Sequence, residues 1–274
     1  MQITKKLKSN SSHFFVALLV MLSITTISCR NMFAELADKE ADAALHYEAK
    51  RLLNSRNYTE AIDILEQDMS ANYFQRRDVQ RTLASAYVGR CGLDFLGLAT
   101  GIIAAGGTNS PMDVALNHMK AATSEADCLE AENIMRAVSE NSDGILSDNN
   151  DDAFFMTFIS LAKVGAILAR IGDAGNDGVI DGGFDACAIA DADTREIGSA
   201  LTLIYNNISA TGSDIASHLG SFSTVCSNPA VQAAGTCAKT DPTTFSAGEL
   251  DMLRGVVNYS PFGVGADVAY TICP

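Results

Sequence analysis

The chain has 274 residues, 47% of them hydrophobic, and a formal net charge of −14, since 33 Asp and Glu outnumber 19 Lys and Arg. Such an acidic surface argues against nucleic acid as a partner, because phosphates need neutralisation by Lys and Arg. It also argues against electrostatic attachment to anionic lipids, whereas cations and basic partner proteins suit it.

The first 28 residues are organised like a bacterial secretory signal. Lys5, Lys6 and Lys8 form a basic start, and an apolar run follows over residues 14–27. This run is shorter than a typical transmembrane helix. We therefore predict an exported protein, with a signal peptide over residues 1–28 and one helical domain over residues 29–274.

The end of this segment, Ser28-Cys29, resembles the lipobox of bacterial lipoproteins. The resemblance implies that Cys29 is acylated and becomes the new N-terminus, which tethers the domain to a membrane of the cell envelope. Thr26 departs from the pattern, in which an aliphatic residue is typical. Arg30 stands where Asp commonly retains such proteins at the inner membrane, which favours the outer membrane. Cleavage without lipid and an uncleaved anchor over residues 9–28 are the other interpretations.

The composition predicts an all-α fold, because alanine is abundant, prolines are few and tryptophan is absent. Apolar residues recur at three- and four-residue intervals over 33–54 and over 58–69, which predicts two helices separated by Asn57. The second segment, with an aromatic Tyr58 followed by Ala61, resembles the second helix of a tetratricopeptide repeat. Ala49 fits the small position of the first helix.

A degenerate second copy of this unit follows. Ala84 lies 35 residues after Ala49, close to the period of about 34 residues in this family, and a second helix is expected around Leu93, Leu96 and Leu98. The resemblance covers about residues 40–100 and implies antiparallel hairpins that offer a concave helical face. Unrelated antiparallel helices are the alternative.

We place the repeat-like part at about 33–109 and a disulfide-stapled helical bundle at about 110–274. Residues 97–110 are apolar, Gly-rich and uncharged. They predict either a close-packed helix pair, which small residues favour, or a flap over an apolar groove. The further helices are expected over 110–123, 126–138, 154–171, 194–208, 214–222 and 246–257. The helix over 154–171 has hardly any polar face and should be central.

An acidic loop follows the central helix. Residues 173–185 resemble the calcium loops of EF-hand and dockerin proteins, in which oxygen ligands alternate around a turn glycine. The resemblance implies a structural calcium site formed by Asp173, Asn176, Asp177, Asp181 and Asp185. Gly175 and Phe184 depart from the pattern, and the acidic segment extends to residue 193. The alternative is a turn whose acids stay solvated. No other cofactor is predicted.

Six cysteines remain when Cys29 is set aside, and an even number in an exported chain predicts up to three disulfides. These cysteines are Cys91, Cys128, Cys187, Cys226, Cys237 and Cys273. The sequence leaves their pairing open. A short loop favours Cys226 with Cys237, neighbouring helices favour Cys91 with Cys128, and Cys187 with Cys273 would fix the C-terminus. Free buried thiols are the alternative.

The sequence offers no convincing catalytic motif, and we expect no enzyme. His46, His118 and His218 have no paired spacing and are expected on the surface or on helix faces. Ser160 and Lys163 match the SxxK motif of penicillin-binding enzymes. The SDN at 147–149 precedes it, whereas that family has the opposite order.

Two functions of different classes remain. The first is a lipid-anchored envelope scaffold that binds a protein or peptide through its helical repeats. The second is an accessory carrier that holds a small or apolar ligand near the Gly-rich segment and the helix that begins at Phe154. An open groove lined by polar and aromatic repeat residues would favour the scaffold, and an enclosed apolar cavity would favour the carrier.

Overall fold

The structure is a computed structural model, which describes residues 41–105, 110–119, 124–208, 225–265, 267 and 269–274. The signal segment, Cys29, His218 and the helix expected over 214–222 lie outside these residues. Within them the fold is all-α, as predicted, and contains no strand. The main helices are α3 (Asp42–Asn54), α4 (Tyr58–Asp63), α5 (Ala71–Phe74), α6 (Arg77–Cys91), α7 (Phe95–Ala105), α8 (Pro111–Met119), α9 (Glu125–Val138), α10 (Asn150–Gly172), α11 (Asp191–Asn207), α14 (Pro229–Ala234) and α15 (Ala247–Asn258).

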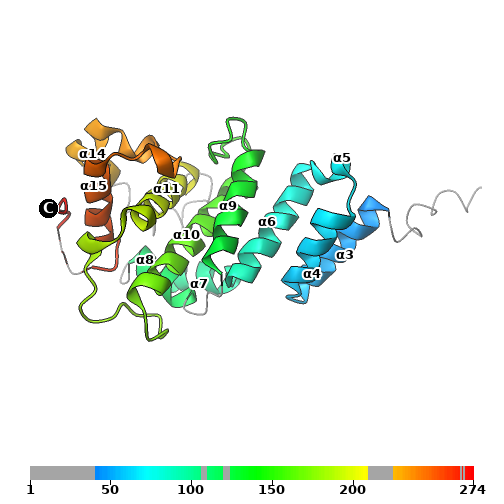
Figure 1. The fold of residues 1–274 in the computed structure, drawn as a ribbon, viewed down its shortest axis with the longest axis horizontal. Coiled ribbons are helices and arrows are strands. Elements are labelled where there is room, and N and C mark those ends of the chain that lie inside the picture. The colour runs from blue at the N-terminus through cyan, green and yellow to red at the C-terminus, as the bar shows by residue number, and fades with distance from the viewer. Residues whose placement is uncertain (1–40, 106–109, 120–123, 209–224, 266, 268) are drawn as a thin grey trace, which may run out of the picture.

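The helices follow one another along the long axis of the molecule. Figure 1 shows α3 and α4 at one end, α6, α9 and α10 in the middle, and α14 and α15 at the other end. Helix α10 is the central helix, and it packs against α8, α9 and α11. Among the described helices, α10 alone is long and apolar enough to cross a membrane, unless the bent pair of α6 and α7 is taken as one span. Because 78% of its apolar window is buried inside the protein, burial in the core accounts for its composition.

Helices α3, α4 and α6 pack against one another at the N-terminal end of the described residues. Helix α4, continued by a π-helical turn at Ile64–Asp68, packs against both α3 and α6. The small residues Ala49, Ala61 and Ala84 are each completely buried. Their missing side-chain bulk lets neighbouring helices approach closely.

The second expected hairpin is wrong in one respect. Helix α7 was expected to fold back on α6, but it leaves α6 at an angle of 72°. The most extensive neighbour of α6 is α9, which lies beside it in Figure 1. The segment with α7 and α8 is therefore inserted between the two helices that pair.

Three local features account for the direction of α7. Gly92 has a φ of +120°, which an L side chain rarely adopts. The disulfide between Cys91 and Cys128 holds the end of α6 to α9. The ring of Phe95 then packs on Phe154 and Phe158 of α10, with centroid separations of 5.6 Å and 4.5 Å.

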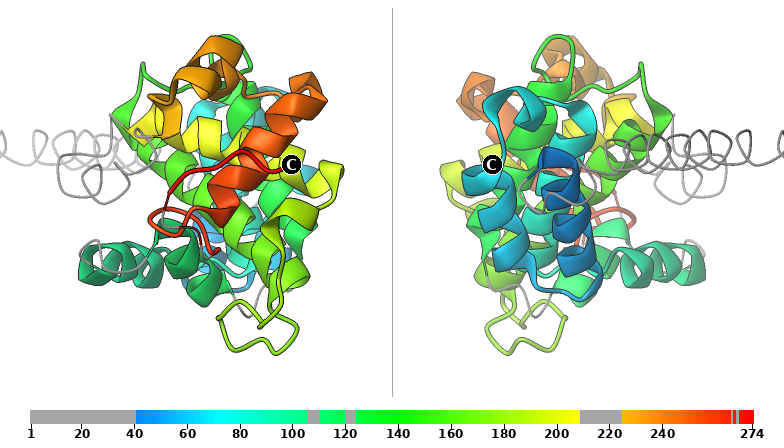
Figure 2. Two further views of the ribbon diagram at one scale, coloured as in Figure 1. Left: turned by 90° about the vertical axis from the view of Figure 1, so that its left-hand side faces the viewer. Right: turned by 90° about the vertical axis from the view of Figure 1, so that its right-hand side faces the viewer.

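The described residues 97–105 of the Gly-rich segment lie in α7 and pack closely against α8, in line with one of the two interpretations of the sequence. A Cβ atom at Gly101 would lie 2.4 Å from His118 Nε2, and one at Gly97 would lie 3.4 Å from His118 Nδ1. Only glycine leaves room for this ring between α7 and α8. Figure 2 shows the teal-green segment that contains these two helices extending sideways from the stack.

Side chains cap several of the helices. The Ser110 hydroxyl accepts the N–H of Asp113, and Ser246 with Glu249 forms a capping box at the start of α15. The side chain of Asn149 caps α10. At the other end of α10, glycine is required at position 172, because a Cβ there would lie 2.6 Å from Ile180 Cδ1.

All six described cysteines are joined in disulfides. The pairs are Cys91 with Cys128, Cys187 with Cys273, and Cys226 with Cys237. These are the pairings that sequence spacing favoured. They fix α6 to α9, the C-terminus to the end of the acidic loop, and the short loop around α14.

Candidate functional site

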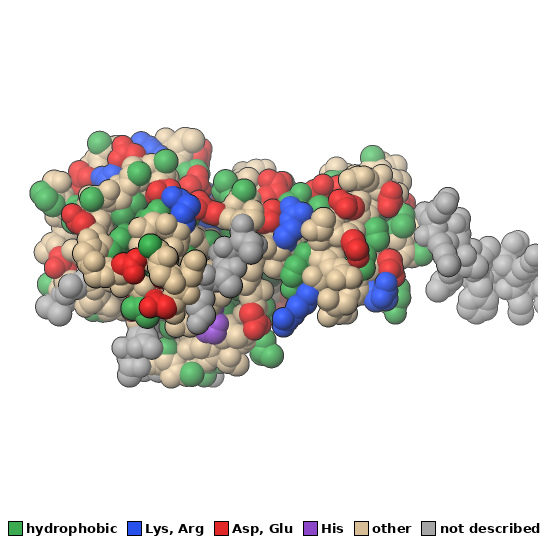
Figure 3. Space-filling view, turned by 60° about the horizontal axis from the view of Figure 1, so that its bottom comes forward, with side chains coloured by type: hydrophobic (Ala, Val, Ile, Leu, Met, Phe, Trp, Pro, Cys, Tyr) green, Lys and Arg blue, Asp and Glu red, His purple; other side chains and the backbone are tan. Residues whose placement is uncertain are grey.

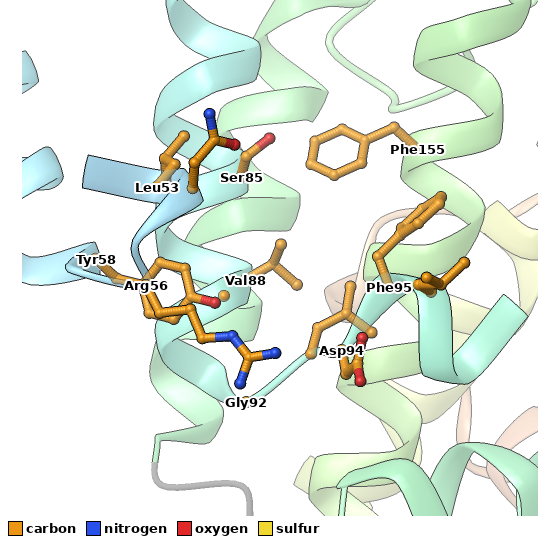
Figure 4. A pocket seen from close by; sticks show the side chains of 13 residues that line it. Leu53, Arg56, Tyr58, Ser85, Val88, Gly92, Asp94, Phe95 and Phe155 are labelled. Carbon is orange, nitrogen blue, oxygen red and sulfur yellow. The ribbon is translucent and has the colours of Figure 1, made fainter. Parts of the chain in front are cut away.

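A groove of about 720 Å³ lies where α7 turns away from α6. One wall comes from the first hairpin and α6, the opposite wall from α7 and α10, and the floor from the turn between α6 and α7 (Figure 4). The lining residues are Leu53, Asn54, Arg56, Tyr58, Ser85, Val88, Gly89, Gly92, Leu93, Asp94, Phe95, Leu96 and Phe155. The groove therefore exists because α7 does not complete the second hairpin.

Tyr58 and Gly89 define the wall on the side of the first hairpin. The Tyr58 ring lies so close to α6 that a Cβ atom at Gly89 would be 2.4 Å from its Cε1 atom. Glycine at this position therefore allows one edge of the ring to approach α6 closely. Figure 4 shows Leu53 and Ser85 on the same wall.

Aromatic side chains form the opposite wall. Phe95 is anchored by its ring contacts with Phe154 and Phe158, and it remains 38% exposed. Phe155 is half-buried, and Figure 4 shows its ring directed across the groove toward Ser85. Leu96 stands at the rim with 71% of its surface exposed. Exposed apolar surface of this extent beside a groove is typical of binding sites.

Covalent and ionic contacts hold the floor and walls in place. The disulfide of Cys91 lies directly before the floor residue Gly92. At the other end of α6, Arg77 and Arg81 pair with Asp152, a carboxylate of α10 that is 1% exposed. Helix α6 is thus fixed to both α9 and α10. These two ion pairs account for a carboxylate that is almost completely buried.

The polar groups of the groove are mostly donors. Arg56 and Asn54 are exposed near the turn after α3, and the Tyr58 hydroxyl lies on the same wall. Asp94 lies on the other side, where its Oδ1 atom accepts the N–H of Gly97 at 3.1 Å. On the face shown in Figure 3, acidic side chains are scattered along the whole length, and Lys and Arg are fewer.

In the acidic loop, Asp173, Asp181 and Asp185 of the predicted calcium ligands accept hydrogen bonds from backbone N–H groups in or next to the loop. The carboxylate of Asp173, which is 1% exposed, accepts the N–H groups of Asp177 and Gly178. Asp181 accepts the N–H of Ala174, and Asp185 caps a short 3-10 turn. Asn176 has a φ of +52° in the same turn.

These hydrogen bonds leave lone pairs on the same carboxylates, because each ionised carboxylate has about four acceptor sites. Among the described residues, no group of three or more His, Cys, Asp or Glu side chains is arranged to hold a metal ion. The calcium site stays a prediction of the sequence, which a calcium titration of the chain would test.

The remaining candidate residues have structural surroundings. His46 lies on a face of helix α3, as one of the two expectations had it, where it is buried and its Nε2 atom lies 2.8 Å from Thr82 Oγ1. Ser160 and Lys163 of the SxxK match are both buried in the core. The Ser160 hydroxyl has no hydrogen-bond partner among the described residues, and Lys163 Nζ lies 2.7 Å from Glu132 Oε2. Neither faces the groove.

No protein-family model matches the chain, and comparisons with the curated proteins and with the solved structures gave no match either.

Sequence reasoning located the groove only roughly. A pocket near the Gly-rich segment and the helix at Phe154 was one of the two predictions, and the groove does lie between Phe95 and Phe155. Arg56 and Asp94 were not singled out. The break in helical spacing at Arg56-Asn57 was a signal that a polar side chain could project there, but sequence alone does not indicate what faces it.

Proposed function

We propose that this chain is a lipid-anchored binding protein of the cell envelope, which holds a segment of a partner protein in the groove between the first hairpin and α7. The single observation that carries this proposal is the composition of the groove. Aromatic and aliphatic side chains form both walls, and donors from the first repeat-like unit stand along one edge. Tethering through Cys29 after residues 1–28 are removed rests on the sequence pattern.

The openness of the groove favours a polypeptide over an enclosed ligand. Its apolar surface continues onto the exposed rim residue Leu96, so an occupant would have one side against the protein and the other toward solvent. A partner that covers the rim would bury apolar surface, which contributes roughly 25 cal/mol per Å². The acidic surface makes nucleic acid an unsuitable partner.

The proposal predicts that a charge at the rim abolishes partner binding. Leu96→Glu places a carboxylate on the exposed apolar rim. Because the Leu96 side chain is 71% exposed, the substitution should not disturb folding. Ile103→Glu is the matched control, because Ile103 lies on the same helix, is 52% exposed and does not line the groove. Proteins cross-linked to the full chain in its native envelope would be compared by mass spectrometry. A partner lost with Leu96→Glu but kept with Ile103→Glu supports the proposal, and equal recovery contradicts it.

A second candidate, an accessory carrier, is favoured by one observation. The groove volume of about 720 Å³ lies within the range of small-molecule sites, about 300–1,000 Å³. Native mass spectrometry of the chain purified from an oxidising periplasm would distinguish the two. An organic molecule that stays bound to the wild type but is absent from Leu96→Glu would support the carrier. A wild-type chain without any bound molecule would support the scaffold.

A further inference from the structure

Among the described residues, Arg56 lies in the groove without a carboxylate partner, although the chain as a whole is strongly acidic. Most described arginines are paired with carboxylates, as Arg51 is with Glu48 at 2.5 Å. In the part of the chain that the structure describes, no carboxylate forms an ion pair or hydrogen bond with Arg56. With 33 acidic residues available, a cation left without one at the edge of an apolar groove points to a ligand that supplies the negative charge.

The backbone directs this cation into the groove. Arg56 has a φ of +64°, a left-handed conformation that costs a residue other than glycine about 1–3 kcal/mol. The N–H groups of Arg56 and Asn57 donate to the carbonyls of Leu53 and Leu52, and these bonds hold the turn. Figure 4 shows the guanidinium reaching from the turn into the lower part of the groove.

Asp94 across the groove does not provide the missing partner. Its carboxylate already accepts the N–H of Gly97 at the start of α7, where the helix dipole also stabilises a negative charge. Asp94 thus has a donor within α7, whereas Arg56 has no carboxylate partner among the described residues. Arg56 therefore offers a charged donor to an anionic group beside apolar side chains.

We infer that the groove takes a polypeptide segment in which an Asp or Glu side chain adjoins an aromatic or aliphatic one. The carboxylate pairs with Arg56, whose planar guanidinium suits two parallel hydrogen bonds. The apolar side chain lies between Phe95, Phe155 and Leu53. This inference rests on the proposed function and specifies the chemistry of the partner.

The test is a selection of random heptapeptides displayed on phage against the immobilised full chain with its disulfides intact. The same library is selected against Arg56→Gln, Arg56→Glu and Ser85→Trp, the last of which fills the groove opposite Phe155. Arg51→Gln is the matched control, because Arg51 is an exposed arginine of α3, close to Arg56 in the sequence, and does not line the groove. Thermal melting establishes that each variant is folded.

The inference predicts peptides with an acidic residue next to an apolar one for the wild type and Arg51→Gln. Arg56→Gln should bind the best such peptide about five-fold or more weakly. Arg56→Glu should select Lys or Arg at the acidic position, and Ser85→Trp should select nothing in common with the wild type.

Two other results overturn it and can be told apart. Apolar peptides that bind the wild type but not Ser85→Trp, and that contain no preferred Asp or Glu, would contradict the pairing with Arg56. The proposed function would still stand. Peptides that bind equally well to Ser85→Trp, or no enrichment on the wild type, would contradict both.

Discussion

Gly89 sets the position of Tyr58 and thereby the shape of one groove wall. Because a Cβ at this position would lie 2.4 Å from the Tyr58 ring, Gly89→Ala forces the ring to move. Overpacking of this kind typically costs about 1–3 kcal/mol. We expect this loss in the free energy of unfolding, measured by urea denaturation, together with weaker partner binding.

A second helical glycine provides the control. Gly248 lies in the first turn of α15, and a Cβ there would have no atom within 4 Å. Gly248→Ala should therefore leave stability unchanged or raise it by up to about 1 kcal/mol. Equal losses in the two variants would show that Gly89 is not specially constrained by Tyr58.

His46 joins α3 to α6 in its neutral form. The Thr82 hydroxyl donates to the Asp78 carbonyl, so its oxygen is left to accept the N–H from His46 Nε2. Burial lowers the pKa of His46, nearby Lys50 and Arg76 lower it further, and Asp78 opposes the shift.

A lowered pKa fixes the sign of the pH dependence. The folded protein disfavours protonated His46, so this contribution to stability is present above about pH 6.5, the ordinary histidine value. It is lost as the pH falls through that value toward the lower pKa of the folded state. We expect the melting temperature to decrease between pH 7.5 and pH 5.5, and to decrease less in His46→Gln. Parallel curves for the two proteins would exclude His46 as the cause.

At the scale of elements, a buried ionic network joins the three central helices. Lys163 of α10 lies 2.7 Å from Glu132 of α9 and 3.1 Å from Glu196 of α11. Arg136 also pairs with Glu132 and donates to Ser199 Oγ. Burial by itself disfavours the charged carboxylate, but the two cations outweigh it and lower the pKa of Glu132.

Removal of one partner from this network should be costly. Lys163→Met leaves Glu132 and Glu196 with too few cations in the core, and breaking a buried pair costs about 3–5 kcal/mol. Arg51→Met removes an exposed pair and should cost at most about 1 kcal/mol. Urea denaturation of both variants tests the difference, and similar small losses would mean that the core tolerates the unpaired acids.

The disulfides should differ in their contribution to stability. They close separations of 86, 37 and 11 residues, for Cys187–Cys273, Cys91–Cys128 and Cys226–Cys237. Loop-closure entropy predicts losses of about 4.6, 3.8 and 2.8 kcal/mol when each pair is replaced by serines. Only the Cys91–Cys128 replacement should also weaken groove binding, because it releases the turn at Gly92. A uniform effect of all three on binding would contradict this assignment.

At the scale of the whole molecule, the features that could be predicted are those that depend on residues close together in the sequence. The small residues Ala49 and Ala61 were recognised from near neighbours in the sequence, and both are completely buried. The course of α7 was not predictable in this way. Leucines at 93, 96 and 98 suit a returning helix as well as an outgoing one, and the choice depends on contacts with Phe154 and Phe158, about sixty residues away.

The same reason explains why the groove was only roughly located. Its walls come from five helices, and Arg56 lies in a turn that is far along the chain from the opposite wall at Phe155. Sequence spacing indicated that a polar break occurs at Asn57. It did not indicate that a groove would lie beside this turn, because the groove results from the angle of 72° between α6 and α7.

The most direct test of groove binding is site-specific photo-crosslinking in cells that express the full chain. A benzophenone side chain replaces Asn54 at the exposed edge of the groove or, as a control, Tyr47, which is 73% exposed on the same helix α3 and does not line the groove. We predict that light joins position 54, but not position 47, to a defined partner, and that Leu96→Glu prevents the product. The same products from both positions, or none from position 54 in the folded protein, would contradict a binding function for this groove.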